Sequence, residues 1–190
     1  MITLDENLLI ERGSERSCYR HPESPNRCIK IVDKHSRRTK ARNKRELKYI
    51  KRYKRAPKPL SIIPNYFGEI STNLGSGHQF ELILDYDGNI STKLSDYVRE
   101  NGTSDYMHEK IVTTYHTFLE SNAVVSDLHP GNLLVQKKTK QDYHLIMVDG
   151  FGNSDFVMIC DFSKFFTKKK LIRKFRRMLV NLKLPITDIQ

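Results

Sequence analysis

Three oxygen-bearing side chains have the types and spacing expected of a divalent-cation site. Asp127 and Asn132 precede one short apolar run and Asp149 follows a second, with a polar turn between the runs, Leu133 to Val135 and Leu145 to Val148. Two such runs joined by a turn predict a β-hairpin, which would bring the three side chains around one point. Two carboxylates and an amide oxygen are hard donors that suit Mg²⁺ together with water and phosphate. The spacing therefore predicts a magnesium and phosphate site.

These residues lie in two motifs that resemble the catalytic and metal-binding segments of protein-kinase-like phosphotransferases. The motifs read D-L-H-P-G-N from Asp127 to Asn132 and D-G-F-G from Asp149. The family pattern has a catalytic Asp, an Asn five positions later and a later metal-binding Asp. The resemblance, closest in form to the branch that includes small-molecule kinases, implies that Asp127 is catalytic, that Asn132 and Asp149 bind metal, and that ATP and Mg²⁺ are the cofactors. The alternative is that these side chains only cap loops, which the pairing of both motifs disfavours.

A lysine in an apolar strand and a glutamate in a basic helix form a second candidate pair. Lys30 lies within R-C-I-K-I-V, and Glu46 is the only acid in the helix expected from about residue 37 to residue 55. In the family that the motifs resemble, the equivalent lysine pairs with ATP phosphates and with a helix glutamate. The resemblance thus implies a Lys30–Glu46 ion pair in the ATP site. The alternatives are an edge-strand lysine that points to water and a glutamate that neutralises its basic helical neighbours.

The turn after the first expected strand is the candidate phosphate-covering loop. Gly13 and Ser14 are small enough to let backbone amides approach phosphates, and Arg16 could add positive charge. The turn has one glycine where the resembled loop has three, so an ordinary hairpin turn is an equal alternative. By the same resemblance, residues 84–87, with Leu84 and Tyr86, would be the hinge that hydrogen-bonds adenine. The cleft beside it would be lined by Ile10, Ile29 and Leu134.

The pattern of strands and helices predicts an α+β, protein-kinase-like fold with two lobes in one domain, residues 1–190. The N-lobe, residues 1–85, would be a five-stranded antiparallel sheet with one helix after its third strand, and Gly75 to Gly77 would be a turn. The C-lobe, residues 86–190, would be short and mostly helical. Its helices are expected at residues 91–100, 105–122 and 163–182, with a strand at 156–160.

The amino-acid composition bears on the partners and the cellular location expected for this protein. Lys and Arg exceed Asp and Glu, and the formal net charge is +11. This charge indicates an anionic partner such as nucleic acid, an acidic membrane face or a phosphorylated substrate, and the alternative is that it serves solubility and a nucleotide site. No apolar run is long enough to span a membrane, and the N-terminus does not resemble a secretory signal. Three cysteines without metal spacing suggest reduced thiols in the cytoplasm. The two basic helices, 37–55 and 163–182, are either solvated faces or contacts for an anionic membrane, and no nucleic-acid motif is present.

Two departures from the kinase pattern stand out. Val125 occupies the position of a His that usually braces the catalytic loop, and Gly150 displaces Phe151 from the position after the metal-binding Asp. No Ala-Pro-Glu motif follows, so a peptide substrate is not expected.

Over its whole length the chain resembles the YrbL-like family, also called PhoP regulatory network proteins. The segments that carry this resemblance are G-S-E-R-S-C-Y-R-H-P, R-C-I-K-I-V, R-E-L-K-Y-I, D-L-H-P-G-N-L-L-V and V-D-G-F-G. The expected function is an ATP- and Mg²⁺-dependent phosphotransferase acting on a hydroxyl of a small molecule or envelope precursor. The alternative is a catalytically weak or inactive kinase-like binding protein within an envelope-stress or low-magnesium regulon.

Overall fold

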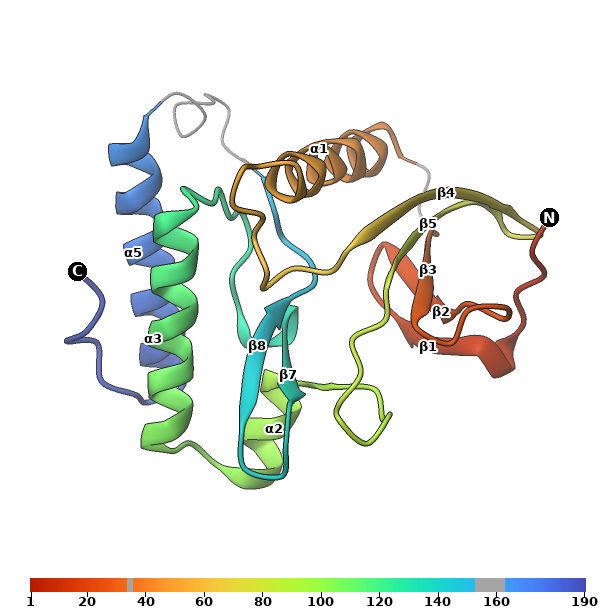
Figure 1. Cartoon of the computed structure of the whole chain (residues 1–190). Helices are drawn as coiled ribbons and strands as arrows, with labels where there is room; N and C mark the ends of the chain where they lie inside the picture. Colours follow the sequence, from red (N-terminus) through yellow and green to blue (C-terminus); the bar gives the residue numbers. More distant parts are fainter. Residues whose placement is uncertain (34–35, 153–162) are drawn as a thin grey trace.

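The chain folds into two lobes, one built on an antiparallel sheet and the other mostly helical (Figure 1). The computed structural model describes residues 1–33, 36–152 and 163–190. The strand expected at residues 156–160 and Cys160 lie outside the described residues. The predicted α+β architecture is confirmed, with one helix after the third strand of a five-stranded sheet.

The N-terminal sheet has the strand order β1-β2-β3-β5-β4, and every neighbouring pair is antiparallel. A 3₁₀ turn, η1 (Glu6–Leu8), precedes the sheet. Its elements are β1 (Leu9–Arg12), β2 (Arg16–Arg20), β3 (Arg27–Val32), α1 (Arg37–Lys54), β4 (Tyr66–Thr72) and β5 (Gly75–Glu81).

The prediction of a turn at Gly75 to Gly77 was wrong, because these residues begin β5. The chain reverses direction just before Gly75, between β4 and β5. There Thr72 Oγ1 accepts a hydrogen bond from Leu74 N and donates one to Gly75 O. Gly77 is required by close packing within the strand. A Cβ atom there would lie 2.6 Å from Ile29 and 2.7 Å from Ile31, so the glycine marks the close approach of two strands.

Helix α1 is held at its start by Ser36, whose hydroxyl accepts a hydrogen bond from Thr39 N. Its buried side includes Leu47, Ile50 and Tyr53, the stripe that the sequence predicts. The same side also buries Glu46. A carboxylate in this position needs a charged or hydrogen-bonding partner, so the helix presents Glu46 to the interior of the site described below.

The C-lobe combines three helices with a small sheet of order β6-β7-β8. Its elements are β6 (Thr92–Lys93), α2 (Leu94–Asn101), α3 (Asp105–Glu120), η2 (Pro130–Asn132), β7 (Leu133–Lys137), β8 (Tyr143–Met147) and α5 (Lys164–Asn181). Helices α3 and α5 lie side by side (Figure 1), and Tyr115 and Phe118 of α3 pack on Phe175 of α5. No helix in the described part of the chain is long and apolar enough to cross a membrane.

The helix expected at residues 91–100 begins three residues later than predicted. Thr92 and Lys93 instead pair with Val135 and Leu134 of β7. Sheet hydrogen bonds to a strand more than forty positions away override the helical pattern at this point. The small β6 strand attaches the start of the C-lobe to the hairpin that carries the predicted catalytic residues.

Candidate active site

The hairpin of β7 and β8 forms as predicted, with Leu133 opposite Met147. Val148 N donates to Asn132 O over 3.0 Å, so the chain beyond β8 stays beside the loop that precedes β7. Asp149 therefore follows one strand where Asn132 precedes the other. The residues that the sequence separates by 17 positions meet at one end of the hairpin, as the spacing predicts.

Gly150 lets the two motifs approach each other. Its φ is +91°, and a Cβ atom there would lie 2.3 Å from Asp127 O and 3.2 Å from Asn132 Nδ2. An L-residue would be strained by the backbone angle and would also collide with a main-chain atom. The glycine that departs from the usual kinase motif is thus required by the contact between the D-G-F-G segment and the loop that carries Asp127.

Asn132 is oriented by this loop. Its Nδ2 donates to Asp127 O over 2.9 Å, which leaves Oδ1 as the oxygen available for a cation. Asp127 has a half-exposed side chain, and its Oδ2 lies 3.7 Å from His129 Nε2. His129 Nδ1 accepts a hydrogen bond from Gly131 N at 3.1 Å, so a neutral ring carries its proton on Nε2, toward Asp127.

The carbonyl of Gly150 braces the catalytic loop in place of the missing histidine. It accepts hydrogen bonds from Ser126 N, Ser126 Oγ and Asp127 N at 2.8, 2.9 and 3.2 Å. Val125 pairs with Phe151 in an isolated antiparallel bridge. Lys174 of α5 donates to Ser126 O. Backbone contacts to the metal motif and one lysine of the last helix therefore set the position of Asp127.

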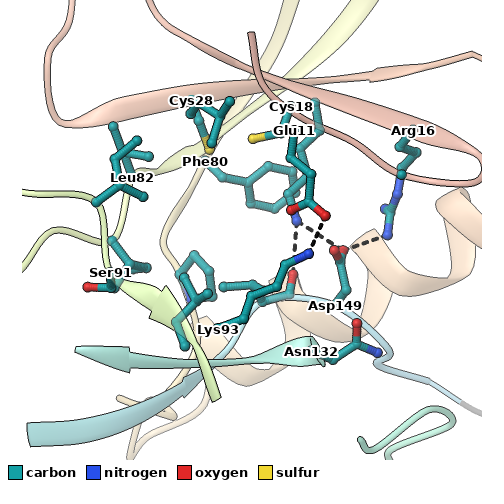
Figure 2. A pocket seen from close by; sticks show the side chains of 18 of the residues that line it. Glu11, Arg16, Cys18, Cys28, Phe80, Leu82, Ser91, Lys93, Asn132 and Asp149 are labelled. Atoms are coloured by element: carbon teal, nitrogen blue, oxygen red, sulfur yellow. Dashed lines mark hydrogen bonds and ion pairs between the residues drawn. The ribbon is translucent and has the colours of Figure 1, made fainter. Parts of the chain in front are cut away.

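Four charged side chains form a connected network beside this loop. Lys30 Nζ lies 2.9 Å from Asp149 Oδ1 and 3.0 Å from Val148 O. Arg16 spans two carboxylates, with Nη2 2.5 Å from Asp149 Oδ1 and Nη1 2.7 Å from Glu46 Oε2. Figure 2 shows the side chains of Arg16 and Asp149 joined by this contact at one side of the pocket. The other oxygen of Glu46 accepts from Gly150 N over 2.7 Å.

The predicted Lys30–Glu46 ion pair was therefore wrong: within the described residues, Glu46 pairs with Arg16 and Lys30 pairs with Asp149. The physical reason is geometric. A guanidinium presents two N–H groups in a fixed fork and can hold two carboxylates at once, whereas an ammonium is a single point charge. Arg16, the first residue of β2, reaches Glu46 of α1 and occupies the position that was assigned to Lys30.

Mutual attraction within the network favours the charged forms of Asp149, Lys30 and Arg16. Burial opposes the charge on Asp149, but Lys30 and Arg16 outweigh it and lower the pKa of its carboxyl group. Burial likewise opposes the charges on Lys30 and Arg16, yet Asp149 raises the pKa of the lysine, and Asp149 with Glu46 raises the pKa of the arginine.

A cavity of about 260 Å³ opens between the lobes next to this network. Its lining includes Ile10, Gly13, Lys30, Asn132, Leu134 and Asp149. The sequence analysis placed all six at the nucleotide or metal site, so the fold brings them together. The walls are otherwise mainly apolar, as expected for a pocket that receives a flat ring with a charged tail.

Six residues expected at this site do not line the cavity. Two of them, Glu46 and Asp127, belong to the ion network and the loop described above, and the other four lie elsewhere. Ser14 lies in the tight turn closed by the Gly13 N to Arg16 O hydrogen bond. Leu84 bridges to Ile90 and its carbonyl accepts from Gln136, while the backbone N–H of Tyr86 donates to Lys137 O. The expected lining residue Ile29 packs with Ile2, Leu4, Tyr19 and Ile31 in a separate apolar cluster.

Strand geometry explains these displacements. Successive residues of a strand point to opposite faces, so Cys28 and Lys30 face the cavity and Ile29 faces away. The chain segment that borders the cavity at the hinge is Leu82 and Ile83, earlier than the predicted Leu84 to Asp87. At the cavity mouth an ion pair between Glu11 of β1 and Lys93 of β6 joins the two lobes (Figure 2).

The model of the family described as PhoP regulatory network protein YrbL matches residues 2–183. The chain belongs to this family. Uncharacterized protein YrbL of Escherichia coli strain K12 is 29% identical over 189 residues, which cover 98% of this chain and 90% of that protein. The protein of the same description from Shigella flexneri matches to the same extent.

A solved structure of WbdD, crystallised with a kinase inhibitor, superposes on this family member with a TM-score of 0.60 and 14% sequence identity. The match covers 92% of this chain and 37% of the WbdD chain, so the chain spans little more than a third of that protein's length. The likeness shows the fold, which is kinase-like.

The donor set of this YrbL-family member fits Mg²⁺ shared with phosphates. The described residues contain no cluster of three or more His, Cys, Asp and Glu that could enclose a metal. Asp149 and Asn132 supply one carboxylate and one amide oxygen. Mg²⁺ is commonly held by one or two carboxylates together with water and substrate phosphates, and it seldom needs a cage made only of protein ligands.

Sequence reasoning underestimated Arg16 and did not assign Glu11, Lys93 or Lys174. A signal existed for Arg16, since it is a cation in the turn that would cover phosphates. No local signal marks the other three residues, because their partners lie 82 and 48 positions away in the chain.

Proposed function

We propose that this protein is an ATP- and Mg²⁺-dependent phosphotransferase whose acceptor is a hydroxyl group on a small molecule. The observation that carries the proposal is that Lys30, Asp149 and Asn132 line one interlobe cavity. The backbone carbonyl of Asp127 is hydrogen-bonded to Asn132, so the loop that carries Asp127 lies next to that cavity. A buried cation beside a carboxylate and an oriented amide oxygen suits a nucleotide triphosphate with its metal. The kinase-like fold supports the same reading.

Each of these residues has its own role in the proposed reaction. Lys30 holds phosphate oxygens of the nucleotide, and Arg16 adds a second cation from the β1–β2 turn. Asn132 Oδ1 and Asp149 would hold Mg²⁺, which supplies charge neutralisation to the phosphates when bound. Asp127, half-exposed at the cavity edge, accepts the proton of the acceptor hydroxyl, and His129 keeps its carboxylate oriented. Most of the rate enhancement then comes from positioning and from neutralised charge.

The acceptor is proposed to be small and anionic. The Asp127 side chain is half-exposed and so can be reached by an acceptor from solvent, and the net charge of +11 favours an acceptor that already carries phosphate or carboxylate. An envelope precursor such as a phosphorylated sugar has this chemistry.

The test measures ADP formation from Mg-ATP with a panel of phosphorylated and unphosphorylated hydroxyl compounds. Asp127→Asn is expected to keep nucleotide binding and to lower turnover by roughly 10²–10⁴-fold, since it removes the base. Asp149→Asn is expected to abolish the dependence of nucleotide binding on Mg²⁺. Asp142→Asn, which alters a carboxylate paired with Lys110 on the surface, is the matched control and should leave both properties unchanged.

A second candidate function is a regulatory nucleotide-binding protein without turnover. The observation that favours it is that Asp149, the carboxylate expected to hold Mg²⁺, is paired with two cations, Lys30 and Arg16. Magnesium-dependent nucleotide binding with no ADP formation for any acceptor would establish this candidate over the phosphotransferase. Absence of nucleotide binding in the presence of Mg²⁺ would reject both.

A further inference from the structure

A second concave site lies on the N-lobe, outside the proposed nucleotide cavity. It is a groove of about 1160 Å³ between α1 and the part of the sheet formed by the end of β3, β4 and β5. Helix α1 lies beside that part of the sheet in Figure 1. One wall is the polar face of α1, and the other is formed by Glu69, Ser76 and His78. Glu46, on the buried side of α1, points into the other site.

The groove is strongly basic along its whole length. The described residues that line it include seven cations and one carboxylate, Glu69; the cations are Lys40, Lys44, Arg45, Lys48, Lys51, Arg52 and Arg55. From Lys40 to Arg55 the helix rises about 22 Å, at 1.5 Å per residue. The groove therefore carries a row of positive charges with a step of about 6 Å between i and i+4 neighbours.

Five of these seven cations are not neutralised by an ion pair within the described part of the chain. Lys40, Lys44, Lys48, Arg52 and Arg55 take part in no ion pair there, and the recorded ion pair of the neighbouring basic residues joins Arg42 to Glu15. Like charges at i and i+4 repel one another. An anion bound along the row removes this repulsion and gains attraction to several cations together, which is the energetic basis for a binding site.

The shape and composition favour a linear ligand over a membrane. Helices that bind membranes insert apolar side chains from the face beside their basic residues. The apolar side chains of α1, Leu47, Ile50 and Tyr53, are buried in the protein core. A flat lipid surface cannot enter a concave groove, whereas an extended chain of anions can lie along it. Phosphates suit both the lysine and the arginine groups present.

We propose that the α1 groove binds a linear chain of phosphates, either inorganic polyphosphate or the backbone of a single-stranded RNA. The site recognises the regular row of negative charges and makes no base-specific contact. The proposal does not depend on phosphotransfer, because none of the lining cations belongs to the Lys30, Arg16 and Asp149 network. Binding is electrostatic and falls steeply as salt concentration rises.

The experiment measures binding of the full chain to two fluorescent probes over a series of salt concentrations: a short inorganic polyphosphate and a uridine oligoribonucleotide of about 12 nucleotides. The variant Lys44→Gln with Lys48→Gln removes two charges from the groove. The matched control, Lys168→Gln with Arg177→Gln, removes two exposed charges from the other basic helix, α5. Thermal unfolding of both variants should match that of the parent, since all four side chains are exposed.

The expected effect follows from counterion release. Each lost phosphate contact reduces the slope of log K against log salt by about 0.7 for a single strand, so the groove variant should lose about 1.4 from the slope. At about 0.1 M salt this corresponds to binding roughly 25-fold weaker. The α5 control should retain the parental slope. Binding of the polyphosphate alone, or of the oligoribonucleotide as well, identifies which source the groove accepts.

Three results would overturn the proposal: binding of neither probe at low salt, equal loss of slope in the α5 control, or binding only to vesicles of anionic phosphatidylglycerol. Proposed catalysis is tested separately by ADP formation. A failure of polyanion binding with intact Mg²⁺-dependent nucleotide binding would reject the groove and leave the nucleotide site in place.

Discussion

Substitution of Arg16 by alanine offers the sharpest test of the ion network. Arg16 bridges Glu46 and Asp149, and the side chain of Glu46 is only 6% exposed. Without Arg16, Glu46 keeps the hydrogen bond from Gly150 N but loses its charged partner. Removing one member of a buried ion pair costs about 3–5 kcal/mol when the other charge stays buried. Because a fifth of the Arg16 side chain is exposed, we expect the lower end, about 3 kcal/mol.

The assay is equilibrium unfolding in urea with linear extrapolation. Arg16→Lys should lose less, about 1–2 kcal/mol, because an ammonium can still pair with one carboxylate but cannot span both. Arg20→Ala, which removes an exposed arginine from the same strand, is the control and should change stability by less than about 0.5 kcal/mol.

A double-mutant cycle gives the test its specificity. If Arg16 and Glu46 are coupled, adding Glu46→Gln to Arg16→Ala should recover part of the loss, with a coupling energy of about 1–3 kcal/mol. The reasoning fails if Arg16→Ala costs no more than Arg20→Ala, or if the two changes at Arg16 and Glu46 are additive. Either result would mean that the guanidinium does not bridge the two carboxylates in solution.

Two further predictions follow from the same site. Gly150→Ala should destabilise the protein by about 3 kcal/mol, because a φ of +91° strains an L-residue and the added Cβ atom would lie 2.3 Å from Asp127 O. The control is Gly88→Ala, at φ +84° with no atom within 4 Å of the added Cβ, which should cost only about 1 kcal/mol. Equal losses of stability in the two variants would contradict the close approach of Gly150 to the Asp127 main chain. The pKa of Asp149 is lowered in the folded state, so its stabilising contribution is present above the unfolded pKa of about 3.9 and is lost as pH falls through the folded pKa. Equilibrium unfolding measured at a series of pH values, from 6 downwards to about 4 and below, should therefore show that the wild-type protein loses more stability than Asp149→Asn. Parallel curves of stability against pH for the two proteins would refute the ion pairs of Asp149.

The catalytic hairpin could be predicted because its information is local. Two apolar runs and a polar turn determine the pairing of β7 with β8, and the positions of Asp127, Asn132 and Asp149 follow from that pairing. The helix that carries Glu46 was equally predictable, because Leu47, Ile50 and Tyr53 recur at helical spacing and lie on its buried side.

The partner of Glu46 could not be predicted from local patterns. Arg16, Lys30 and Glu46 lie on three different elements, and either cation satisfies the requirement that a buried carboxylate be neutralised. The outcome depends on how far the β1–β2 turn reaches over α1. The predicted hinge residues and the predicted orientation of Ile29 differ from the structure for a related reason, because a shift of one residue along a strand exchanges its two faces.

The amino-acid sequence by itself determined which side chains of this protein could do chemistry and most of the elements that carry them, because periodicity and spacing act over short stretches of chain. The kinase-like class of the fold followed from the resemblance of its motifs to a known family. Only the tertiary structure decided which cation meets which carboxylate, which hinge residues border the cavity and that the basic face of α1 lines a groove. Those outcomes depend on contacts between segments up to 133 positions apart, whose relative placement is set by the packing of the whole molecule.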